Sequence, residues 1–324
     1  MMRKAESKGQ LRNKQMNIIR MTGGLGNQMF QYALYLKLKT LGREVKLDDI
    51  TEYEGRDARP LMLWIFGIEY PKATLREIDE ITDGFLKLTH RIRRKLFGRK
   101  SMEYMEKDCN FDEEILKREP AYLTGYFQSE KYFKDIEPLV RDSFQFSQRM
   151  WDGISEELVG KIKFYQEQID NTLSVSIHIR RGDYLDNAEA YGNICTDDYY
   201  RKAVAVMRER FPEGSFFVFS NEPEWTKRWI ADQYGKDSGF TIIEGTDENI
   251  GYLDLYLMSR CKHHILANSS FSWWGAWLNP SADKLVIVPD RWFGNQDCAD
   301  IYTEGMLKIS PEGEITKQGA QNDR

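Results

Sequence analysis

The sequence has only four cysteines among 324 residues and no long apolar segment. No run approaches the roughly 20 apolar residues that span a bilayer, and the N-terminus lacks the apolar centre of a signal peptide. The cysteines form no CxxC pair, which disfavours zinc binding and redox chemistry and predicts reduced thiols at Cys109, Cys195, Cys261 and Cys298. These absences predict a cytoplasmic protein.

An excess of positive charge is also missing. The formal net charge is −5, which argues against nucleic acid as a partner. With 41% hydrophobic and 30% charged residues, the composition is that of a folded globular protein, and the chain is long enough for two domains. Residues 1–15 are polar and basic without periodicity, so we expect a disordered N-terminal extension before Met16.

A short apolar run, a polar cluster and a segment of helical spacing recur in this order through the C-terminal half. The apolar runs are 173–179, 215–219, 240–243, 263–267 and 284–288. This alternation predicts a parallel sheet with helices between the strands. Thr196 is a suitable N-cap and Pro223 suits a first helical turn. Because ligands bind beyond the carboxyl ends of such strands, we expect the polar clusters to converge on one site.

The N-terminal half begins in the same way, with strand, glycine-rich loop, helix and strand over residues 17–49. Residues 50–165 are aromatic and poorly patterned, and we expect mostly helices there. The chain is therefore divided into an extension, an N-terminal domain, a C-terminal Rossmann-like domain and a polar C-terminal tail, at 1–15, 16–168, 169–312 and 313–324.

The segment HIRRGDY at 178–184 follows an apolar alternation typical of a half-buried strand. Two adjacent guanidiniums repel each other, and a phosphate or carboxylate bound between them would reverse that cost. The alternative is a surface ion pair with Asp183 or a nearby glutamate, worth about 0–1 kcal/mol. The segment alone favours neither interpretation.

Three other polar clusters lie at expected strand ends. The loop GGLGNQ at 23–28 precedes a helix, where backbone amides favour an anion, although a plain chain reversal would also explain its glycines. Asn221 could simply cap the helix near Pro223. Asp254 is either a solvated helix residue or an acceptor for a base edge. In NSSFSWWGAW at 268–277, the hydroxyls suit phosphate, and at least one tryptophan is expected in the core.

Other features of the sequence are assigned to structure. His263 and His264 stand at a strand start, away from the expected ligand. The basic run 87–100 is either a solvated helix face or a surface that meets an anionic membrane. No Asp-x-Asp occurs, so arginines rather than a metal ion would have to neutralise a diphosphate.

Four motifs resemble those of the α-1,2-fucosyltransferases of glycosyltransferase family 11. They are GGLGNQMFQYA at 23–33, HIRRGDY at 178–184, FVFSNEPEW at 217–225 and NSSFSWWGAWL at 268–278. The resemblance implies a GT-B-like α/β fold with two Rossmann-type domains facing a central cleft, of which the first binds the acceptor and the second GDP-fucose. It also implies a bacterial enzyme that transfers fucose from GDP-β-L-fucose to O2 of a terminal β-galactoside, with inversion and without a metal or other cofactor. The acceptor would belong to an oligosaccharide or a surface polysaccharide.

The resemblance assigns roles residue by residue. Arg180 would contact the β-phosphate and stabilise the charge that grows on the leaving diphosphate. Asn27 would lie near the leaving oxygen. Asp183 is the first candidate for the general base and Glu189 the second, with Asp183 as an orienting partner of the arginines as the alternative. His178 and Asp254 would bind guanine. The complete set expected to bind the donor is Gly24, Gly26, His178, Arg181, Ser220, Asn221, Glu222, Asp254, Asn268, Ser269 and Ser270.

Two alternatives to this function remain open. A transferase of another linkage or another GDP-sugar would keep Arg180 and the serines. A non-catalytic protein that binds nucleotide sugars or glycans would keep the fold, but the presence of Arg180, Asp183 and Asn27 argues against it. Peripheral contact with the inner face of the membrane is compatible with each of these functions.

Overall fold

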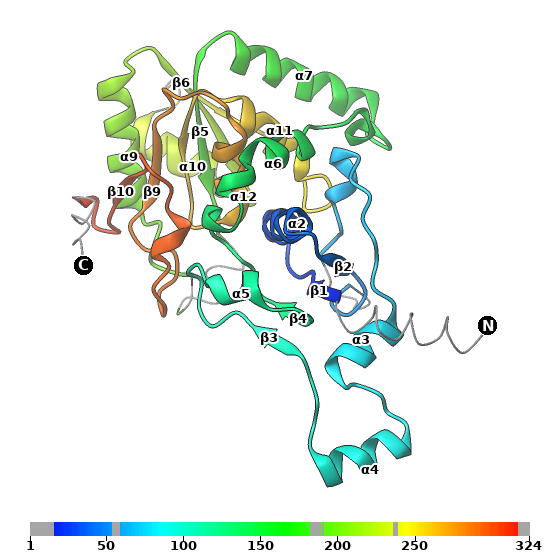
Figure 1. The fold of residues 1–324 in the computed structure, drawn as a ribbon. Coiled ribbons are helices and arrows are strands. Elements are labelled where there is room, and N and C mark those ends of the chain that lie inside the picture. The colour runs from blue at the N-terminus through cyan, green and yellow to red at the C-terminus, as the bar shows by residue number, and fades with distance from the viewer. Residues whose placement is uncertain (1–15, 54–58, 182–188, 190, 236–238, 317–324) are drawn as a thin grey trace. The chain divides into compact units, whose positions relative to one another are not determined.

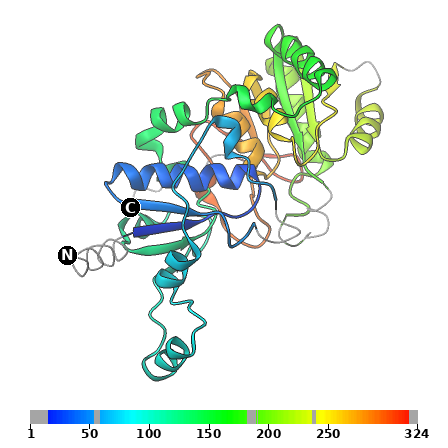
Figure 2. The ribbon, with the colours of Figure 1, turned by 90° about the vertical axis from the view of Figure 1, so that its right-hand side faces the viewer.

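The chain forms two compact α/β units in the computed structural model, which describes residues 16–53, 59–181, 189, 191–235 and 239–316. The contacts divide the chain into Met1–Gln145 and Phe146–Arg324, called unit 1 and unit 2 below. Each unit has its own, largely parallel sheet flanked by helices (Figure 1; Figure 2). The predicted α/β class with two Rossmann-type domains is therefore confirmed.

Unit 1 contains a four-stranded parallel sheet in the order β2-β1-β4-β3. The strands are β1 (Met16–Arg20), β2 (Glu44–Asp48), β3 (Glu103–Met105) and β4 (Ala121–Thr124). The α-helices are α2 (Leu25–Thr40), α3 (Leu75–Thr82), α4 (Leu88–Phe97), α5 (Glu113–Lys117) and α6 (Glu137–Ser143). Short 3-10 helices are η2 (Leu63–Phe66), η3 (Glu130–Tyr132) and η4 (Lys134–Ile136). The sequence did not predict β3 and β4, which are too short to display an alternating pattern.

Unit 2 contains a seven-stranded sheet in the order β11-β10-β9-β8-β5-β6-β7. The strands are β5 (Leu173–Ile179), β6 (Gly214–Ser220), β7 (Phe240–Ile242), β8 (His263–Ile265), β9 (Val286–Pro289), β10 (Leu307–Ile309) and β11 (Ile315–Thr316). The α-helices are α7 (Glu156–Asp170), α9 (Asp197–Arg210), α10 (Pro223–Tyr234), α11 (Tyr252–Arg260) and α12 (Ser270–Leu278), with 3-10 helices η5 (Gln148–Trp151) and η6 (Ala299–Ile301).

The strand order of unit 2 locates its expected binding edge. The chain builds β5, β6 and β7 outward in one direction and then returns to add β8, β9 and β10 on the other side of β5. This is the doubly wound order, and ligands of such sheets bind at the carboxyl ends of the two strands where the direction changes. In unit 2 these strands are β5 and β8, which pair in parallel.

The central strand β5 is buried on both faces, which corrects the half-buried strand predicted from its alternation. Ser174, Ser176 and His178 are buried like their apolar neighbours, because β5 is an interior strand between β8 and β6 with helices on both faces of the sheet. The Ser176 hydroxyl has a hydrogen-bond partner inside the protein, since its Oγ lies 2.8 Å from His264 Nδ1. A half-buried and a fully buried strand have the same period, so only the sheet position distinguishes them.

Several local predictions for unit 2 are confirmed. Thr196 caps α9, since its hydroxyl accepts a hydrogen bond from the Tyr199 amide at 3.2 Å, and Pro223 occupies the first turn of α10. Helix α11 starts at Tyr252, after a turn in which Asp247 Oδ1 accepts hydrogen bonds from the amides of Asn249 and Ile250.

Helices α11 and α12 pack closely because of a glycine. A Cβ at Gly275 would lie 2.9 Å from Met258 Cβ, so a side chain there would push the two helices apart. Burying apolar side chains in such a contact stabilises the fold by roughly 1.5–3 kcal/mol for each large residue. The contact fixes α11, and with it Asp254, against the sheet edge.

The unit boundary differs from the expected one at residue 168. Helix α7 lies wholly in unit 2 and packs on α11, where Arg260 Nη2 bonds Asp170 Oδ2 at 2.7 Å. The expected C-terminal tail also begins too early, because Ile315–Thr316 pairs with β10 in antiparallel fashion. The expected extension 1–15 and residues 317–324 lie outside the described residues.

The cysteines divide into two groups. Cys195 and Cys261 are free thiols, as predicted. Cys109 and Cys298 are disulfide-bonded, which corrects the expectation of four reduced thiols. Sequence spacing could not reveal this, because neither cysteine belongs to a CxxC pair.

Candidate functional site

The carboxyl ends of β5 and β8 carry the two polar segments that the sequence singled out. Arg180 and Arg181 follow β5 directly, and Asn268 and Ser269 follow β8 after two apolar residues. Because β5 and β8 are neighbours, the sheet brings together segments that are almost ninety residues apart. The predicted convergence is thus reproduced for these two segments.

Arg181 is engaged by residues that follow β6. Its guanidinium carbon lies 3.6 Å from the centroid of the Trp225 ring, and its Nε lies 3.4 Å from Glu222 Oε2. The Asn221 amide accepts a hydrogen bond from the Arg181 N–H and donates one to the Arg181 carbonyl, both at 3.0 Å. Asn221 therefore fixes the main chain of Arg181, and the interpretation of Asn221 as a helix cap is wrong. The N-cap of α10 is Glu222, whose amide donates to Ser220 Oγ at 3.1 Å.

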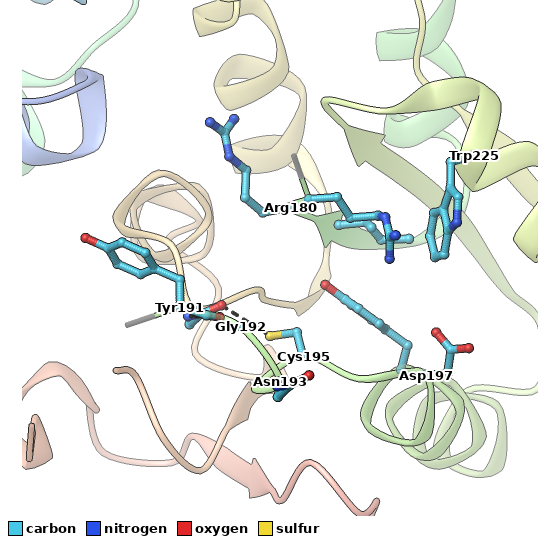
Figure 3. A pocket seen from close by; sticks show the side chains of 11 residues that line it. Arg180, Tyr191, Gly192, Asn193, Cys195, Asp197 and Trp225 are labelled. Carbon is cyan, nitrogen blue, oxygen red and sulfur yellow. Dashed lines mark hydrogen bonds between the residues drawn. The ribbon is translucent and has the colours of Figure 1, made fainter. Parts of the chain in front are cut away.

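Arg180 takes a different direction from its neighbour. Its side chain is 17% exposed, and Nη2 lies 3.7 Å from Glu248 Oε1, in a glutamate whose side chain is 60% exposed. Figure 3 shows the Arg180 guanidinium directed away from Trp225. The two arginines therefore do not hold one anion between them, which corrects the geometry that the sequence suggested. An anion at the sheet edge would meet Arg180.

A small pocket of about 40 Å³ opens beside the end of β5 (Figure 3). Its lining includes Arg180, Tyr191, Cys195, Trp225 and Asn268. The volume admits a few water-sized groups, such as phosphate oxygens, but is too small for a nucleotide.

A larger hollow of about 390 Å³ follows β9 and is formed by residues in the range 290–302. Asn268 connects it to the smaller pocket, because Nδ2 donates to the Trp292 carbonyl at 3.1 Å. Asp290 Oδ1 and the Tyr302 hydroxyl are buried here without a hydrogen-bond partner among the described residues. The sequence analysis assigned no role to this segment.

His178 and Asp254 each present a buried polar atom without a hydrogen-bond partner in the described part of the chain: Nδ1 of the histidine and Oδ1 of the carboxyl group. Burial, and secondarily the charge of Arg180, lowers the pKa of His178 to about 3, so its ring is neutral. Burial raises the pKa of Asp254 to about 7, and its Oδ2 accepts a hydrogen bond from Thr246 Oγ1 at 3.1 Å. Asp254 is thus not a solvated helix residue. A ligand with N–H groups would satisfy such atoms.

At the start of α12, Asn268 has a structural role, whereas the Ser269 hydroxyl makes no capping hydrogen bond. Asn268 supports neighbouring chain, and its Oδ1 lies 3.5 Å from Cys195 Sγ, which donates to it. Ser269 is the N-cap, but its hydroxyl makes no capping hydrogen bond, and Ser270 opens the helix. All three tryptophans of α12, at positions 273, 274 and 277, are core residues. The helix start therefore offers Ser269 and backbone amides to an anion.

The glycine-rich loop of unit 1 positions Asn27 at the corresponding place in the other sheet. Gly23 has a φ of +76°, and a Cβ there would lie 2.4 Å from Asn27 Nδ2. Asn27 Oδ1 accepts a hydrogen bond from Gln128 Nε2 at 2.8 Å. Gln128 follows β4, the parallel neighbour of β1, so the contact joins the loops after both strands. Gly24 is the N-cap of α2 and Gly26 lies in its first turn, and their contact with the donor stays a prediction.

The other polar residues of this loop are structural. Gln28 is fully buried, donates to the Pro60 carbonyl at 2.9 Å and accepts from the Met62 amide at 2.9 Å. Gln31 donates to the Gly125 carbonyl at 3.0 Å. These contacts explain Gln28 without a ligand.

Glu106 is a candidate that sequence reasoning missed. Its carboxylate accepts hydrogen bonds from the amides of Tyr126 at 2.8 Å and Phe127 at 3.0 Å, in a turn where Phe127 has a φ of +54°. Burial raises the pKa of Glu106 to about 7. Through this turn Glu106 holds Gln128, and through Gln128 it orients Asn27. Glu106 is in an ordinary charged segment, so nothing in the sequence marked it.

The structure describes only one of the two candidates for the general base. Asp183 lies outside the described residues, so its role stays a prediction. Glu189 is exposed in a turn. In the described ranges, no three His, Cys, Asp or Glu side chains gather as metal ligands would. His264, by contrast, is structural as expected, with Nε2 lying 3.0 Å from Asn279 Nδ2.

In unit 2, a doubly wound sheet carries a cation, Arg180, and a helix start at its strand ends, an arrangement typical of α/β proteins that bind phosphate-bearing ligands. The model of glycosyl transferase family 11 matches residues 102–307. An alpha-1,2-colitosyltransferase of Escherichia coli is 32% identical over 86% of this chain and 93% of its own length. The O-antigen biosynthesis glycosyltransferase WbnK of Escherichia coli is 30% identical over 89% and 99%. The chain belongs to glycosyl transferase family 11.

Solved structures are more distant in sequence. Arabidopsis thaliana FUT1 in complex with GDP is 12% identical, with a TM-score of 0.48 over 89% of this chain and 76% of that one. Among the described residues, no helix is long and apolar enough to cross a membrane.

Proposed function

We propose that this enzyme transfers L-fucose from GDP-β-L-fucose to O2 of a terminal β-galactoside, with inversion and without a metal ion. The observation that carries the proposal is Arg180 at the end of β5, one of the two strands where the doubly wound sheet changes direction. Membership of family 11 supports the reaction class. His178 Nδ1 and Asp254 Oδ1 support the nucleobase, since guanine has N–H groups for a carboxylate acceptor.

In the proposed reaction, the bond between fucose C1 and the β-phosphate oxygen breaks, and GDP leaves with the electron pair. The acceptor O2 forms the new bond from the opposite face and loses its proton to a base, for which Asp183 stays the candidate. Arg180 contributes most when the diphosphate gains charge, because a fixed cation binds the developing anion more strongly than the ground state. Ser269 and the start of α12 add hydrogen-bond donors.

No metal has a part in this proposal, because the Arg180 guanidinium and the start of α12 can supply the positive charge. Activity should therefore survive EDTA. Loss of activity in EDTA, restored by Mg²⁺ or Mn²⁺, would contradict the metal-free mechanism.

Transfer of colitose is a second candidate, because one relative is an alpha-1,2-colitosyltransferase at 32% identity. Colitose differs from fucose by the absence of one hydroxyl group. A site with a buried partner for that hydroxyl would reject the deoxy sugar by orders of magnitude, whereas an apolar site would accept both. The contacts described above concern the nucleotide and do not discriminate between the sugars.

The test is GDP release by the purified protein, with GDP-fucose and GDP-colitose as donors in parallel. Lactose and galactose-β-1,3-N-acetylglucosamine serve as acceptors, and NMR assigns the linkage of the product. Acceptor-dependent release from GDP-fucose with fucose on galactose O2 supports the proposal. Turnover of GDP-colitose alone selects the second candidate. Tight binding without turnover on a broad glycan panel would indicate a non-catalytic protein.

A further inference from the structure

Helix α4 stands apart from the rest of unit 1. None of its residues from Leu88 to Phe97 is buried. The chain leaves at the end of α3 and returns to the same place, because the Met102 amide donates to the Ile81 carbonyl at 2.9 Å. Both views show α4 at a distance from the sheet of unit 1 (Figure 1; Figure 2). The helix is therefore connected to the unit at one point and is not part of its core.

The face of α4 that contacts the protein is basic. Arg94 donates to the carbonyls of Asp83 at 2.7 Å and Phe85 at 2.9 Å, and Arg93 forms an ion pair with the Asp83 carboxylate. The His90 ring lies 4.7 Å from that of Phe85. These contacts hold the face of α4 with His90, Arg93 and Arg94 against residues 83–85.

The apolar stripe of α4 consequently faces away from the protein. Leu88, Ile92 and Leu96 follow one another at intervals of four residues, so they lie within an arc of about 80° on the helix. Their exposed fractions are 69%, 50% and 69%, and the adjoining Leu86 is 86% exposed. In a globular protein such a stripe normally packs on the core. In α4 the basic face contacts the protein and the apolar stripe is exposed, which indicates that a partner outside this chain covers the stripe.

Positive charge surrounds the stripe. Between Phe85 and Met102 there are seven Lys and Arg residues and no Asp or Glu. Arg93 and Arg94 hold the helix to Asp83, and Arg99 pairs with Glu103 at 3.1 Å. Lys87, Arg91 and Lys95 have no ion pair with the described residues, and Arg91 and Lys95 lie next to the stripe on the helix. The surface therefore combines apolar side chains with unpaired cations.

We propose that α4 lies in the interface of an anionic membrane, with Leu88, Ile92 and Leu96 among the acyl chains and Arg91 and Lys95 at the headgroups. Apolar contact plus attraction to anionic lipid is the combination that holds amphipathic basic helices on membranes. A hydrophobic protein groove would match the leucines, but it would leave the cations without partners unless it were acidic. This inference concerns where the enzyme works and is independent of the proposed donor and acceptor.

The test uses the full chain in sedimentation with two kinds of vesicles. One kind is phosphatidylcholine alone, and the other is phosphatidylcholine with one third phosphatidylglycerol. We expect the partition coefficient to be at least about tenfold higher on the anionic vesicles and to fall as salt is added. Equal or absent binding to the two kinds of vesicles would overturn the proposal.

Two variants separate the apolar and ionic contributions. The combined change Leu88→Ser, Ile92→Ser, Leu96→Ser should abolish binding, and Arg91→Gln with Lys95→Gln should weaken it about tenfold or more. The matched controls change exposed residues elsewhere: Leu75→Ser for the apolar set, and Lys39→Gln with Lys163→Gln for the charges. The controls should bind like the natural protein.

Turnover with a soluble donor and acceptor should be unchanged in all these variants, which keeps the test separate from the proposed function. Light scattering of the protein without vesicles supplies a further check. If the natural chain dimerises and the triple serine variant does not, the stripe is covered by a second copy and the membrane proposal is wrong. The membrane proposal would also be wrong if the triple serine variant bound anionic vesicles as strongly as the natural chain.

Discussion

The guanidinium of Arg181 stacks on Trp225 at 3.6 Å, while the neighbouring Arg180 extends away from that ring (Figure 3). Two residues that look equivalent in the sequence therefore have separate environments. Arg181 is committed to Trp225, Glu222 and Asn221. Arg180 forms an ion pair with Glu248, whose side chain is exposed.

We predict that Arg180→Ala lowers kcat by about 10²–10³, because it removes a charge that stabilises the leaving diphosphate. Arg181→Ala should lower kcat by less than tenfold and instead reduce the free energy of unfolding by about 1 kcal/mol, since it loses a stacked cation. Steady-state kinetics and urea unfolding measure both. Near-normal turnover of the Arg180 variant would show that the phosphate contact is misassigned.

The turn held by Glu106 gives a second prediction. Gln128→Ala should lower kcat about tenfold with little change in the affinity for GDP, because Asn27 loses the amide that orients it.

Glu106→Gln should also lower kcat, by less than Gln128→Ala, and should flatten the rise of kcat between pH 6 and 8. That rise is expected in the natural enzyme because the pKa of Glu106 is raised to about 7, and the ionised carboxylate is the better acceptor for the two amides.

The control for this pair is Glu103→Gln, which changes a more exposed carboxylate nearby on β3. Its pH profile should match that of the natural enzyme. If Glu106→Gln keeps the full pH dependence, another group is responsible and Glu106 is only structural.

Asp254 gives a prediction for nucleotide binding. Its pKa is raised to about 7 by burial, so a growing fraction is ionised between pH 6 and 8. An ionised carboxylate accepts N–H groups of guanine better than the neutral acid, so the affinity for GDP should increase across this range. His178 stays neutral throughout, because its pKa is lowered to about 3. Calorimetry should show a smaller increase for Asp254→Asn, and an unchanged increase would contradict the assignment.

Buried histidines predict how unit 2 responds to acid. The pKa of His264 is held well below its usual range by burial and then by the charge of Lys284, so the folded state binds a proton less readily than the unfolded state. The free energy of unfolding should therefore be at its full value above about pH 6.5 and fall below it, by about 2 kcal/mol per such histidine at pH 5. Urea titrations at both pH values measure the loss. A smaller loss is expected for His264→Gln, and an equal loss would exclude His264 as its source.

The sequence predicted the unit 2 sheet well because its strands are bounded by strong local signals. The run 173–179 matches β5 residue for residue, and Thr196 and Pro223 mark helix starts by side-chain chemistry that needs no distant partner. The boundary near residue 146 had no such signal. Helix α7 belongs to unit 2 through Asp170 and Tyr165, contacts that only the folded chain reveals.

The sequence predicted which residues belong to the candidate site, but it did not predict which of them form hydrogen bonds with one another. Arg180 and Asp254 stood out because a cation and a carboxylate are unusual beside apolar strands and helices. That Asn221 binds the backbone of Arg181, and that Gln128 binds Asn27, depends on which strands are neighbours. Spacing in the sequence carries no information on such pairs when the partners are forty or a hundred residues apart.

The chain that contains α4 leaves unit 1 and returns to it at the same place. Residues 84–101 therefore form an insertion that could be removed as a whole. Ile81 and Met102 are joined by a backbone hydrogen bond, so a short turn could replace everything between them without altering a strand of the sheet. β3, which follows, is an edge strand and constrains no strand beyond it. If α4 binds the membrane as proposed, exchange of this segment between related enzymes would change which membrane holds the enzyme and leave the strand ends of both sheets unchanged.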